Sequence, residues 1–420
     1  MNADPRMRGF ARRSDVADVE ALLESRVTTQ LPSEDLATQH AAGRVLAGAV
    51  VSPIDLPPFD RSAMDGYAVR GEDTFGAEPF TPVRLRVIGQ ALPGRAFAGT
   101  VASGTAVRIM TGAPLPAGAD AVLKVEDSRL LEELSEGQAG AVEVTAAVAP
   151  ERNVSRRGED VAASAELLPE LRLLRPQDVA VALAAGIANV RVVRQPRFAV
   201  VTTGNELLAP GERPQDHRIV DTNGVMVAAL LRRDGATAQL YERIPDDARA
   251  LREVLSQVDG DGIIVCGGSS VGAEDHVPAV VRELGELPVH GIAMRPSSPT
   301  GVGFFDERPV FLLPGNPVSC LCAYDFFAGP TVRFLGGRSR PWPYVRRSLP
   351  LARKINSEGG RVDYARVIVK DGAVEPLLVS GASILSSTVR ADGVVIVPRD
   401  AEGIEAGATV TVHLYGEAVS

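Results

Sequence analysis

The spacing of hydrophobic residues in the first third of the chain predicts two helices followed by a β segment. A first helix is predicted behind a Ser14 N-cap from four apolar residues at helical spacing, which are Val16, Val19, Leu22 and Leu23. A second helix is predicted from Ser33, as its N-cap, to Gly43, which can end it. From residue 50 to about residue 150, short apolar runs alternate with polar residues and are interrupted by Pro and Gly, which predicts an all-β segment.

Strands and helices alternate in the second half of the chain. Pro176 suits the first position of a helix that Gly186 ends. Strands are then predicted at residues 198–201, 239–244, 263–265 and 310–313, and helices at residues 221–231, 246–258, 275–284 and 317–335. This alternation predicts a parallel, doubly wound sheet. β signals return at residues 366–369, 394–397 and 410–414, which indicates a small barrel or sandwich at the end of the chain.

These patterns predict four domains in a chain of 420 residues, within the two to four that this length allows at about 150 residues each. Residues 14–50 and 151–190 are each too small to form a core, so we expect one discontinuous N-terminal domain from both. The all-β insertion covers residues 51–150, the α/β domain residues 191–338, and the C-terminal β-barrel domain residues 339–420. The predicted fold class is therefore α/β plus β.

The composition excludes several classes of protein. With 45% hydrophobic and 23% charged residues, the chain can bury enough apolar surface to fold. A net charge of −9 argues against a nucleic-acid partner. Three cysteines cannot build a disulfide framework, and the longest apolar stretch, residues 179–188, is too short to cross a membrane. Because the N-terminus also lacks the apolar run of a secretory signal, we expect a cytoplasmic protein with no membrane association.

Polar, Gly-rich segments follow the predicted strands of the α/β domain, where open parallel sheets bind their ligands. They are residues 202–206 (TTGNE), 245–247 (PDD), 267–272 (GGSSVG) and 314–317 (PGNP). The backbone N–H groups of the third segment could cradle an anion, and Glu206, Asp246 and Asp275 could hold Mg²⁺. Any one such loop is more often a simple turn or helix cap; several at one sheet edge favour a site. Neither a Walker A loop nor a GxGxxG fingerprint is present, which argues against a P-loop ATPase and a dinucleotide oxidoreductase.

The β segment contains further polar clusters. Residues 57–69 (PPFDRSAMDGYAV) hold two carboxylates, a hydroxyl and a phenol, while residues 110–116 and 156–160 form similar polar turns. Each of these clusters can also be explained as turn chemistry. Arg152, Arg156 and Arg157 place positive charge beside carboxylates, as a site for a phosphate and a metal would need.

Six segments together resemble the molybdopterin molybdenumtransferase family, whose members are MoeA-type enzymes and the E domain of gephyrin. The segments are PPFDRSAMDGYAV (57–69), RIMTGAPLPAGADAV (108–122), RRGEDV (156–161), TTGNEL (202–207), GGSSVGAED (267–275) and LPGNPVS (313–319). The resemblance covers nearly the whole chain in the same order. It implies a homodimer of four-subdomain chains that inserts molybdate into adenylylated molybdopterin and releases AMP. It further implies Mg²⁺ as cofactor and a molybdopterin adenylyltransferase as upstream partner.

The resemblance also implies the site residues. The catalytic positions would be Asp65, Thr111, Asp160, Asp246 and Asp275. The metal would be held by Glu206, Asp246 and Asp275. The substrate would contact Thr203, Gly204, Glu206, Gly267, Gly268, Ser269, Ser270, Arg295, Ser298, Pro314, Gly315, Asn316, Arg366 and Ser383, with Arg366 at the oxyanion.

The chain departs from the family pattern in the loop at residues 291–299. Of three expected lysines only Arg295 keeps a positive charge, since Gly291 and Ser298 occupy the other two positions. Asn205 replaces an expected aspartate, and Ala382 an expected serine that Ser380 and Ser383 flank. Because the neighbouring cations are gone, we expect Arg295 to carry a larger share of the local positive field than any one lysine does in typical relatives. Its guanidinium can still fork onto a tetrahedral oxyanion. The alternatives are a paralogue that loads another oxyanion such as tungstate, and a non-catalytic molybdopterin-binding or scaffold protein.

Overall fold

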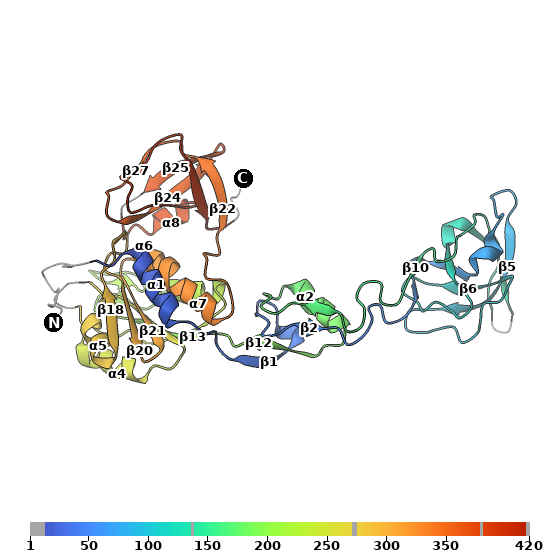
Figure 1. Ribbon diagram of the computed structural model, residues 1–420, viewed down its shortest axis with the longest axis horizontal. Helices are drawn as coiled ribbons and strands as arrows, with labels where there is room; N and C mark the ends of the chain where they lie inside the picture. Colours follow the sequence, from blue (N-terminus) through green and yellow to red (C-terminus); the bar gives the residue numbers. More distant parts are fainter. Residues whose placement is uncertain (1–12, 136–137, 271–274, 379–380, 417–420) are drawn as a thin grey trace. The chain divides into compact units, whose positions relative to one another are not determined.

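The computed structural model describes residues 13–135, 138–270, 275–378 and 381–416. Two compact units are present (Figure 1): the first comprises the described residues of 1–34, 43–47 and 192–420, and the second those of 35–42 and 48–191. Within the described part of the chain, no helix has both the length and the apolar character needed to cross a membrane.

The first unit contains a six-stranded sheet whose first four strands are parallel. Its order across the sheet is β16 (Thr237–Leu240), β13 (Arg197–Thr202), β17 (Gly262–Cys266), β21 (Arg308–Leu313), β20 (Gly301–Phe305) and β18 (Glu286–His290). The pairs β16–β13, β13–β17 and β17–β21 are parallel, which confirms the predicted parallel sheet. From β13 the chain continues to β16 on one side of it and then returns to β17 on the other side. The strand order therefore reverses between β13 and β17.

Two antiparallel strands, β20 and β18, extend this sheet and were not predicted. Two glycines in β20 made the segment resemble a loop, since glycine weakens an isolated strand. Packing requires Gly303, because a Cβ there would lie 2.6 Å from the Glu286 carbonyl oxygen. A Cβ on Gly301 would lie 3.2 Å from Leu312 Cδ2, so that side chain would have to shift slightly. The close approach of neighbouring strands therefore explains the glycines.

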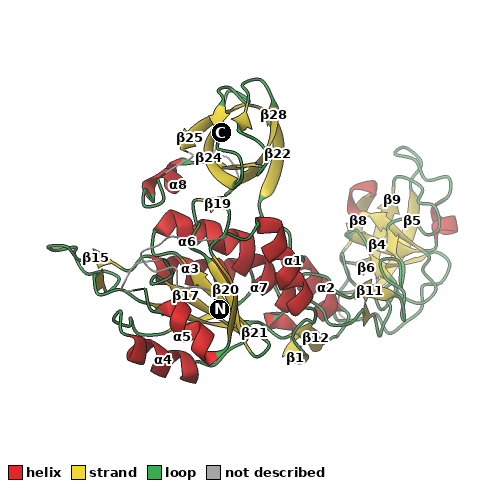
Figure 2. Ribbon diagram, turned by 60° about the vertical axis from the view of Figure 1, so that its left-hand side comes forward, coloured by secondary structure: helices red, strands yellow, loops and turns green. Residues whose placement is uncertain are grey.

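Helices cover both faces of the sheet (Figure 2). One face packs against α1 (Val16–Arg26), α3 (Asn223–Arg233), α6 (Pro317–Ala323), the π-helical η4 (Tyr324–Ala328) and α7 (Gly329–Leu335). The other face packs against α4 (Ala248–Gln257) and α5 (Val277–Leu284). The predicted helices at residues 221–231, 246–258 and 275–284 are thus confirmed with slightly shifted ends, and the predicted helix at 317–335 contains a π-helical turn.

The N-terminal prediction needs two corrections. Helix α1 packs its Val19 and Leu23 side chains into the core of the α/β sheet, so it does not belong to a discontinuous domain with residues 151–190. The predicted second helix is instead the strand β1 (Ser33–Ala37) and the short turn η1 (Thr38–His40). Tertiary hydrogen bonds explain the change, because the Thr38 N–H and hydroxyl donate to the carbonyls of Ala188 and Ile187.

The C-terminal part of the first unit is a small barrel. Its strands pair in the order β19 (Met294–Arg295), β24 (Val362–Lys370), β26 (Gly393–Val397), β28 (Thr409–Leu414) and β22 (Val345–Pro350), with β25 (Ala373–Leu378) also paired to β24. A bridge between Leu351 and Val374 closes the ring. The short pair β23 (Ile355–Asn356) with β27 (Gly403–Ile404) and the helix α8 (Ser386–Arg390) flank it. The predicted β signals near residues 366, 394 and 410 are confirmed.

Two buried aspartates stabilise the helical layer of the α/β domain, and Asp325 also connects it to the barrel. Asp234 accepts hydrogen bonds from Arg333 (2.9 Å), Arg233 (2.9 Å) and the Tyr324 hydroxyl (3.0 Å). Asp325 on η4 accepts from the Tyr344 hydroxyl at the joint (2.9 Å) and the Tyr364 hydroxyl on β24 (3.0 Å). Burial removes water from the Asp325 carboxylate and raises its pKa above the usual value. The two tyrosine hydroxyls replace hydrogen bonds that this water would have made.

The second unit is mostly β structure, as predicted. Its six-stranded sheet has the order β7 (Ala121–Lys124), β4 (Gly66–Val69), β6 (Thr105–Ile109), β5 (Val83–Ala91), β9 (Gly140–Val144) and β8 (Ser128–Glu132). Outside it, β3 (Arg61–Ser62) pairs with β10 (Val154–Ser155), and β2 (Val50–Val51) with β11 (Glu166–Leu168). The other elements here are η2 (Gly71–Thr74), η3 (Val125–Asp127), α2 (Pro176–Ala184) and β12 (Asn189–Val193). The first unit also contains a short parallel pair, β14 (Leu207–Leu208) with β15 (Ile219–Val220). Pro176 begins α2 as predicted, and Asp178 caps it through the Arg175 N–H (2.9 Å).

The Asp234 cluster gives a prediction about stability. Asp234→Asn removes the counter-charge of Arg333, whose side chain is only 3% exposed, and should lower the free energy of unfolding by roughly 3–5 kcal/mol. Glu283→Gln breaks the exposed pair with Arg252 and should cost only about 0–1 kcal/mol. Urea denaturation of both variants measures the difference. Equal losses in the two variants would contradict the role given to Asp234.

Candidate functional site

A cavity of about 690 Å³ opens where the strand order reverses between β13 and β17. Open α/β sheets bind ligands at this position, beyond the carboxyl ends of the strands. Many of its lining residues were predicted as site residues: Thr203, Gly204, Glu206, Asp246, Gly267, Gly268, Ser269, Ser270, Asp275, Pro314, Gly315, Asn316 and Ser383. The structure therefore brings together the loops that follow β13, β16, β17 and β21. The Val271 and Gly272 positions of the predicted Gly-rich loop lie outside the described residues.

The loop after β17 depends on glycine. Gly267 has a φ of +94°, a conformation that side chains disfavour. A Cβ at this position would also lie 2.4 Å from the Thr203 carbonyl oxygen of the neighbouring strand. The two loops on either side of the strand reversal can therefore approach each other only without a side chain here, which keeps their backbone groups at the cavity.

Asp246 is fixed by the loop after β13. The Thr203 hydroxyl donates to its Oδ1 (2.8 Å) and the Asn205 N–H to its Oδ2 (3.1 Å), while the Asp246 N–H donates to Asn205 Oδ1 (3.3 Å). The helix-capping explanation does not apply, because the N-cap of α4 is Asp247, which accepts from the Ala250 N–H (2.8 Å). An asparagine at position 205 also suits Asp246, because an aspartate there would place a second negative charge beside the Asp246 carboxylate and repel it.

The carboxylates of this cavity fit a Mg²⁺ ion that is shared with a bound ligand. Glu206, Asp246 and Asp275 all line the cavity. Among the residues that the structure describes, no three His, Cys, Asp or Glu side chains form a ready-made metal cluster. Mg²⁺ commonly takes one or two protein carboxylates and completes its shell with waters and phosphate oxygens. This donor set therefore suits Mg²⁺ together with a phosphate-bearing substrate.

The sequence analysis missed two polar residues in this cavity, Asp221 and Asn223. Asp221 is 8% exposed and accepts from the Gly224 N–H (3.1 Å). Asn223 donates to the Gly315 carbonyl (2.7 Å), whereas its Oδ1 and the Ser269 hydroxyl are buried without a hydrogen-bond partner among the described residues. The signal in the sequence was the DTN triplet at the start of a helix, which can be explained as a cap.

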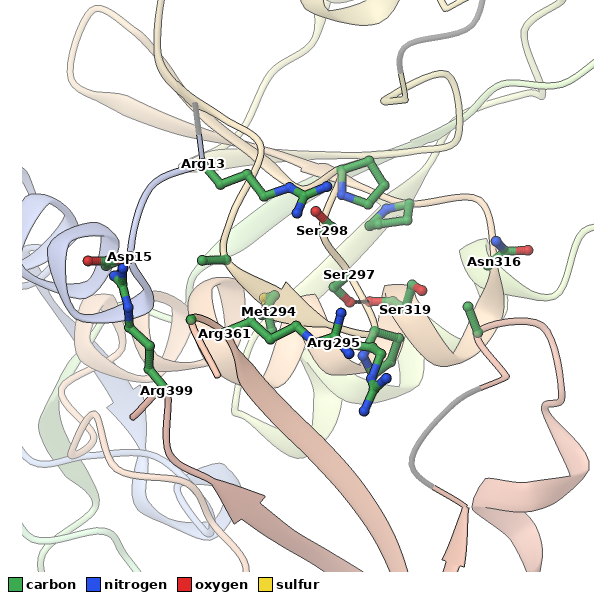
Figure 3. A pocket seen from close by; sticks show the side chains of 16 residues that line it. Arg13, Asp15, Met294, Arg295, Ser297, Ser298, Asn316, Ser319, Arg361 and Arg399 are labelled. Atoms are coloured by element: carbon green, nitrogen blue, oxygen red, sulfur yellow. Dashed lines mark hydrogen bonds and ion pairs between the residues drawn. The ribbon is translucent and has the colours of Figure 1, made fainter. Parts of the chain in front are cut away.

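A second cavity, of about 400 Å³, is rich in arginine. Figure 3 shows Arg295 and Arg361 converging below Ser297 and Ser298, while Arg13 extends toward Ser298. Four arginines line it in all: Arg13, Arg295, Arg361 and Arg399. Arg295 is therefore not alone in supplying the positive charge of this cavity, since three further arginines from other parts of the chain line it.

The barrel arginines that line this cavity are Arg361 and Arg399, and the expected Arg366 is not among them. Arg366 is fully buried and donates to the carbonyls of Leu378 (3.2 Å) and Gly381 (3.3 Å). Arg361 lines the cavity, as does Ala382, which replaces the expected serine. Ser383 faces the first cavity, and Ser380 lies outside the described residues.

The two cavities adjoin. Pro299, Pro314 and Asn316 line both of them. A ligand in the first cavity and an anion in the second would therefore meet across the turn that begins α6. This turn places a cavity lined by carboxylates next to a cavity lined by guanidinium groups.

Three predicted site residues belong to the second unit. Asp65 accepts hydrogen bonds from both the Thr111 N–H (2.7 Å) and the Thr111 hydroxyl (2.8 Å), and these bonds lower the pKa of Asp65 below its usual value. The structure thus brings Asp65 and Thr111 together. Asp160 is exposed, and its N–H donates to the Leu56 carbonyl (2.9 Å).

The arginine pair of the second unit is already occupied by carboxylates. Arg156 donates to Asp60 Oδ2 (2.6 Å) and Arg157 Nε to Asp55 Oδ2 (2.6 Å). The Arg157 N–H also donates to Asp60 Oδ1 (2.8 Å), which is the main reason why the pKa of Asp60 is lowered. The predicted phosphate site at this pair is therefore neutralised within the unit.

The fold and the two cavities define a multidomain protein with a ligand-binding α/β domain joined to a barrel. Three parts of the chain match family models: residues 14–186 match "MoeA N-terminal region (domain I and II)", residues 199–333 "Probable molybdopterin binding domain", and residues 348–415 "MoeA C-terminal region (domain IV)". The chain belongs to the MoeA family.

Individual relatives agree with this assignment. A Mycobacterium tuberculosis protein named molybdopterin molybdenumtransferase 2 is 36% identical over 322 residues, which are 73% of this chain and 76% of the relative. A Staphylococcus aureus molybdopterin molybdenumtransferase is 30% identical over 321 residues, 74% of each chain. The crystal structure of a molybdopterin biosynthesis MoeA protein from Pyrococcus horikoshii has a TM-score of 0.78 at 32% identity and covers 96% of this chain and 100% of its own.

The Asp65–Thr111 pair predicts a specific titration. The pKa of Asp65 is lowered, so its bonds to Thr111 form in the ionised state and are lost as the pH falls through that lowered pKa. Thr111→Val removes the hydroxyl donor and should raise the pKa of Asp65 toward its usual value of about 3.9. NMR titration of labelled aspartate carboxyls measures this, with Thr81→Val, an exposed threonine of the same unit, as control. An unchanged pKa in Thr111→Val would show that the hydroxyl does not stabilise the carboxylate.

Proposed function

We propose that this chain inserts molybdate into adenylylated molybdopterin and releases AMP. The observation that carries the proposal is the shared wall of Pro299, Pro314 and Asn316 between the two cavities. Molybdate is a compact tetrahedral dianion, which guanidinium and hydroxyl donors recognise well. The larger cavity, at the strand reversal, is suited to a nucleotide-like ligand. The names of the relatives, molybdopterin molybdenumtransferases, agree with this division.

Residues of the first cavity would hold the adenylylated pterin. Gly268 and Ser269 line this cavity, and their backbone N–H groups would suit phosphate oxygens, whereas the Gly267 N–H donates to the Leu313 carbonyl (3.0 Å). The unpartnered Asn223 Oδ1 and Ser269 hydroxyl offer hydrogen bonds to a heterocycle, because buried polar groups without partners are costly unless a ligand completes them. Glu206, Asp246 and Asp275 would hold Mg²⁺, which supplies charge neutralisation for the phosphoanhydride.

Residues of the second cavity would hold the oxyanion beside the dithiolene. Arg295 and the Ser298 hydroxyl line this cavity, and the Arg295 Nε and Ser298 Oγ have no hydrogen-bond partner among the described residues. No protein nucleophile is required, because the dithiolene sulfurs accept the metal. The protein's contribution is to fix both reactants in contact and to stabilise the charge that develops on the leaving phosphate.

Two other functions would use parts of the same site. A paralogue that loads tungstate is compatible with the arginine cavity, since tungstate is also a tetrahedral dianion; competition between the two oxyanions in a binding titration distinguishes them. A non-catalytic molybdopterin-binding or scaffold protein would need no fixed carboxylate, whereas Asp246 lines the cavity and is held by two donors. We therefore favour the enzyme, which we place in the cytoplasm and downstream of a molybdopterin adenylyltransferase.

We further propose a homodimer in which each site draws on both chains. Asp65 and Thr111 belong to the second unit, whereas Asp246, Asp275 and Arg295 belong to the first. A family site that needs residues of both units can be completed from a partner chain.

The carboxylates give the direct test of the reaction. Asp246→Asn and Asp275→Asn should each lower AMP release from adenylylated molybdopterin, Mg²⁺ and molybdate by about 100-fold or more, as for loss of a preorganised charge. Asp247→Asn is the matched control, because Asn caps a helix as well as Asp does and Asp247 only caps α4. Normal AMP release by the two variants, with wild-type thermal unfolding, would remove Asp246 and Asp275 from the mechanism.

Mixed dimers test the shared site. An Asp65→Ala chain and an Asp275→Asn chain, each inactive alone, should regain about a quarter to a half of the wild-type activity when co-purified through different tags, because one of the two sites would be intact. Light scattering establishes that the species is a dimer. A monomer, or a verified heterodimer without activity, would contradict a site built from two chains.

A further inference from the structure

We propose that His290 is a positioning residue that aims the Ser270 N–H at the phosphate of the bound substrate. The inference rests on the proposed function and deepens it, because it concerns how the loop after β17 holds an adenylylated ligand. Among the described residues, Ser269 and Ser270 line the cavity at the strand reversal, whereas His290 does not. His290 therefore acts through the loop and does not touch the ligand.

The sheet places His290 at the edge from which the site loops emerge. Strand β18 is antiparallel to β20, and β20 is antiparallel to β21, so β18 runs in the same direction as the parallel strands. His290 is the last residue of β18, and it therefore lies at the carboxyl edge, where such sheets bind ligands. Strands β21 and β20 separate β18 from β17, so the contact of His290 with the loop after β17 joins two distant parts of this edge.

The imidazole of His290 lies between an arginine and a carbonyl group. Its Nε2 is 2.9 Å from the Ser269 carbonyl oxygen, and its Nδ1 is 3.4 Å from Nη2 of Arg282 on α5. A carbonyl oxygen can only accept a hydrogen bond, and a guanidinium can only donate one. The proton of the neutral ring is therefore on Nε2, which donates to Ser269, while Nδ1 accepts from Arg282.

The bond from His290 sets the direction of the next N–H group in the loop. The peptide bond between Ser269 and Ser270 precedes no proline and is trans. In a planar trans peptide, the C=O and the N–H that follows it point in opposite directions. Because the Ser269 carbonyl points to His290, the Ser270 N–H points away from it, toward the cavity that both serines line.

The two serines at this peptide lie where a ligand is expected. The Ser269 residue is 2% exposed, and its hydroxyl has no hydrogen-bond partner among the described residues although Ser269 lines the cavity. A buried hydroxyl of this kind is rare and indicates a group that completes it. Ser270 is exposed at the same cavity, so a bound phosphate can reach its N–H.

A fixed peptide orientation matters more for an anion than for a neutral ligand. Hydrogen bonds from a backbone N–H to an oxyanion are charge-assisted and stronger than neutral ones, and a preorganised donor needs no ordering when the ligand binds. Without the bond from His290, the peptide between Ser269 and Ser270 could rotate and turn its carbonyl dipole toward the phosphate. His290 therefore presents the donor and keeps a repulsive acceptor away.

Calorimetric titration of the full chain with AMP, in the presence of Mg²⁺, measures the effect. His290→Leu should weaken AMP binding by about 10-fold, near the low end for one hydrogen bond to a charged group, because the N–H is misdirected and not removed. His290→Gln keeps an N–H near the position of Nε2 and should recover most of the loss. His40→Leu changes an exposed histidine of the second unit; this matched control should bind AMP as the wild type does.

Two further measurements separate positioning from a general loss of structure. Adenosine lacks the phosphate, so its affinity should change by less than about twofold in His290→Leu. In protein that contains isotope-labelled serine, AMP should shift the Ser270 amide resonance of the wild type, and His290→Leu should move that resonance before ligand is added. Thermal unfolding identifies folded variants. His290→Asn, which is polar but too short to reach the Ser269 carbonyl, repeats the test if His290→Leu does not fold.

Four outcomes would overturn the inference. They are no AMP binding by the wild type, wild-type AMP affinity in folded His290→Leu or His290→Asn, an equal loss of adenosine affinity, and a Ser270 resonance that does not respond to AMP.

AMP release from adenylylated molybdopterin and molybdate tests the proposed function separately. A chain that releases AMP normally, but whose AMP affinity does not depend on His290, would keep the proposed function and lose only this assignment. A chain that binds AMP through this loop but releases none from the pterin substrate would keep the assignment and lose the proposed reaction.

Discussion

The two-residue pairing of β19 with β24 is the interaction on which the arginine cavity depends. It joins a loop of the α/β domain to the barrel strand β24, and it sets Arg295 opposite Asp363. The loop that contributes Ser297 and Ser298 follows directly, and the barrel contributes Arg361 and Arg399 from its side. Without this pairing, the positive side chains would belong to two separate surfaces. With it, they line one cavity next to the ligand cavity of the sheet.

The second requirement is the reversal of strand order between β13 and β17. Loops that leave adjacent strands in opposite directions open a space between them, and Gly267 allows those loops to approach closely. The two requirements are independent, since one concerns the sheet and the other the barrel. They meet at the turn before α6, where Asn316 lines both cavities.

The sequence predicted the α/β sheet, the all-β segment and the terminal barrel because those elements have strong local patterns. It failed where tertiary contacts decide. The glycines of β20 are explained only by the neighbouring strand and helix, residues 33–40 became a strand and turn through bonds to Ile187 and Ala188, and α1 joined the α/β core. Strand-end loops were recognised as a site because their position follows from topology. Arg361, Arg13 and Arg399 were missed because no spacing in the sequence indicates that they approach Arg295.

The origin of the cavity walls bears on how such a site could arise. The residues that line the cavity at the strand reversal come almost wholly from the sheet and its loops, whereas the guanidinium groups of Arg361 and Arg399 come from the barrel. An ancestral sheet domain standing alone would have had the first cavity and only half of the second. Fusion to a barrel would then add arginine side chains beside an existing ligand cavity in a single event.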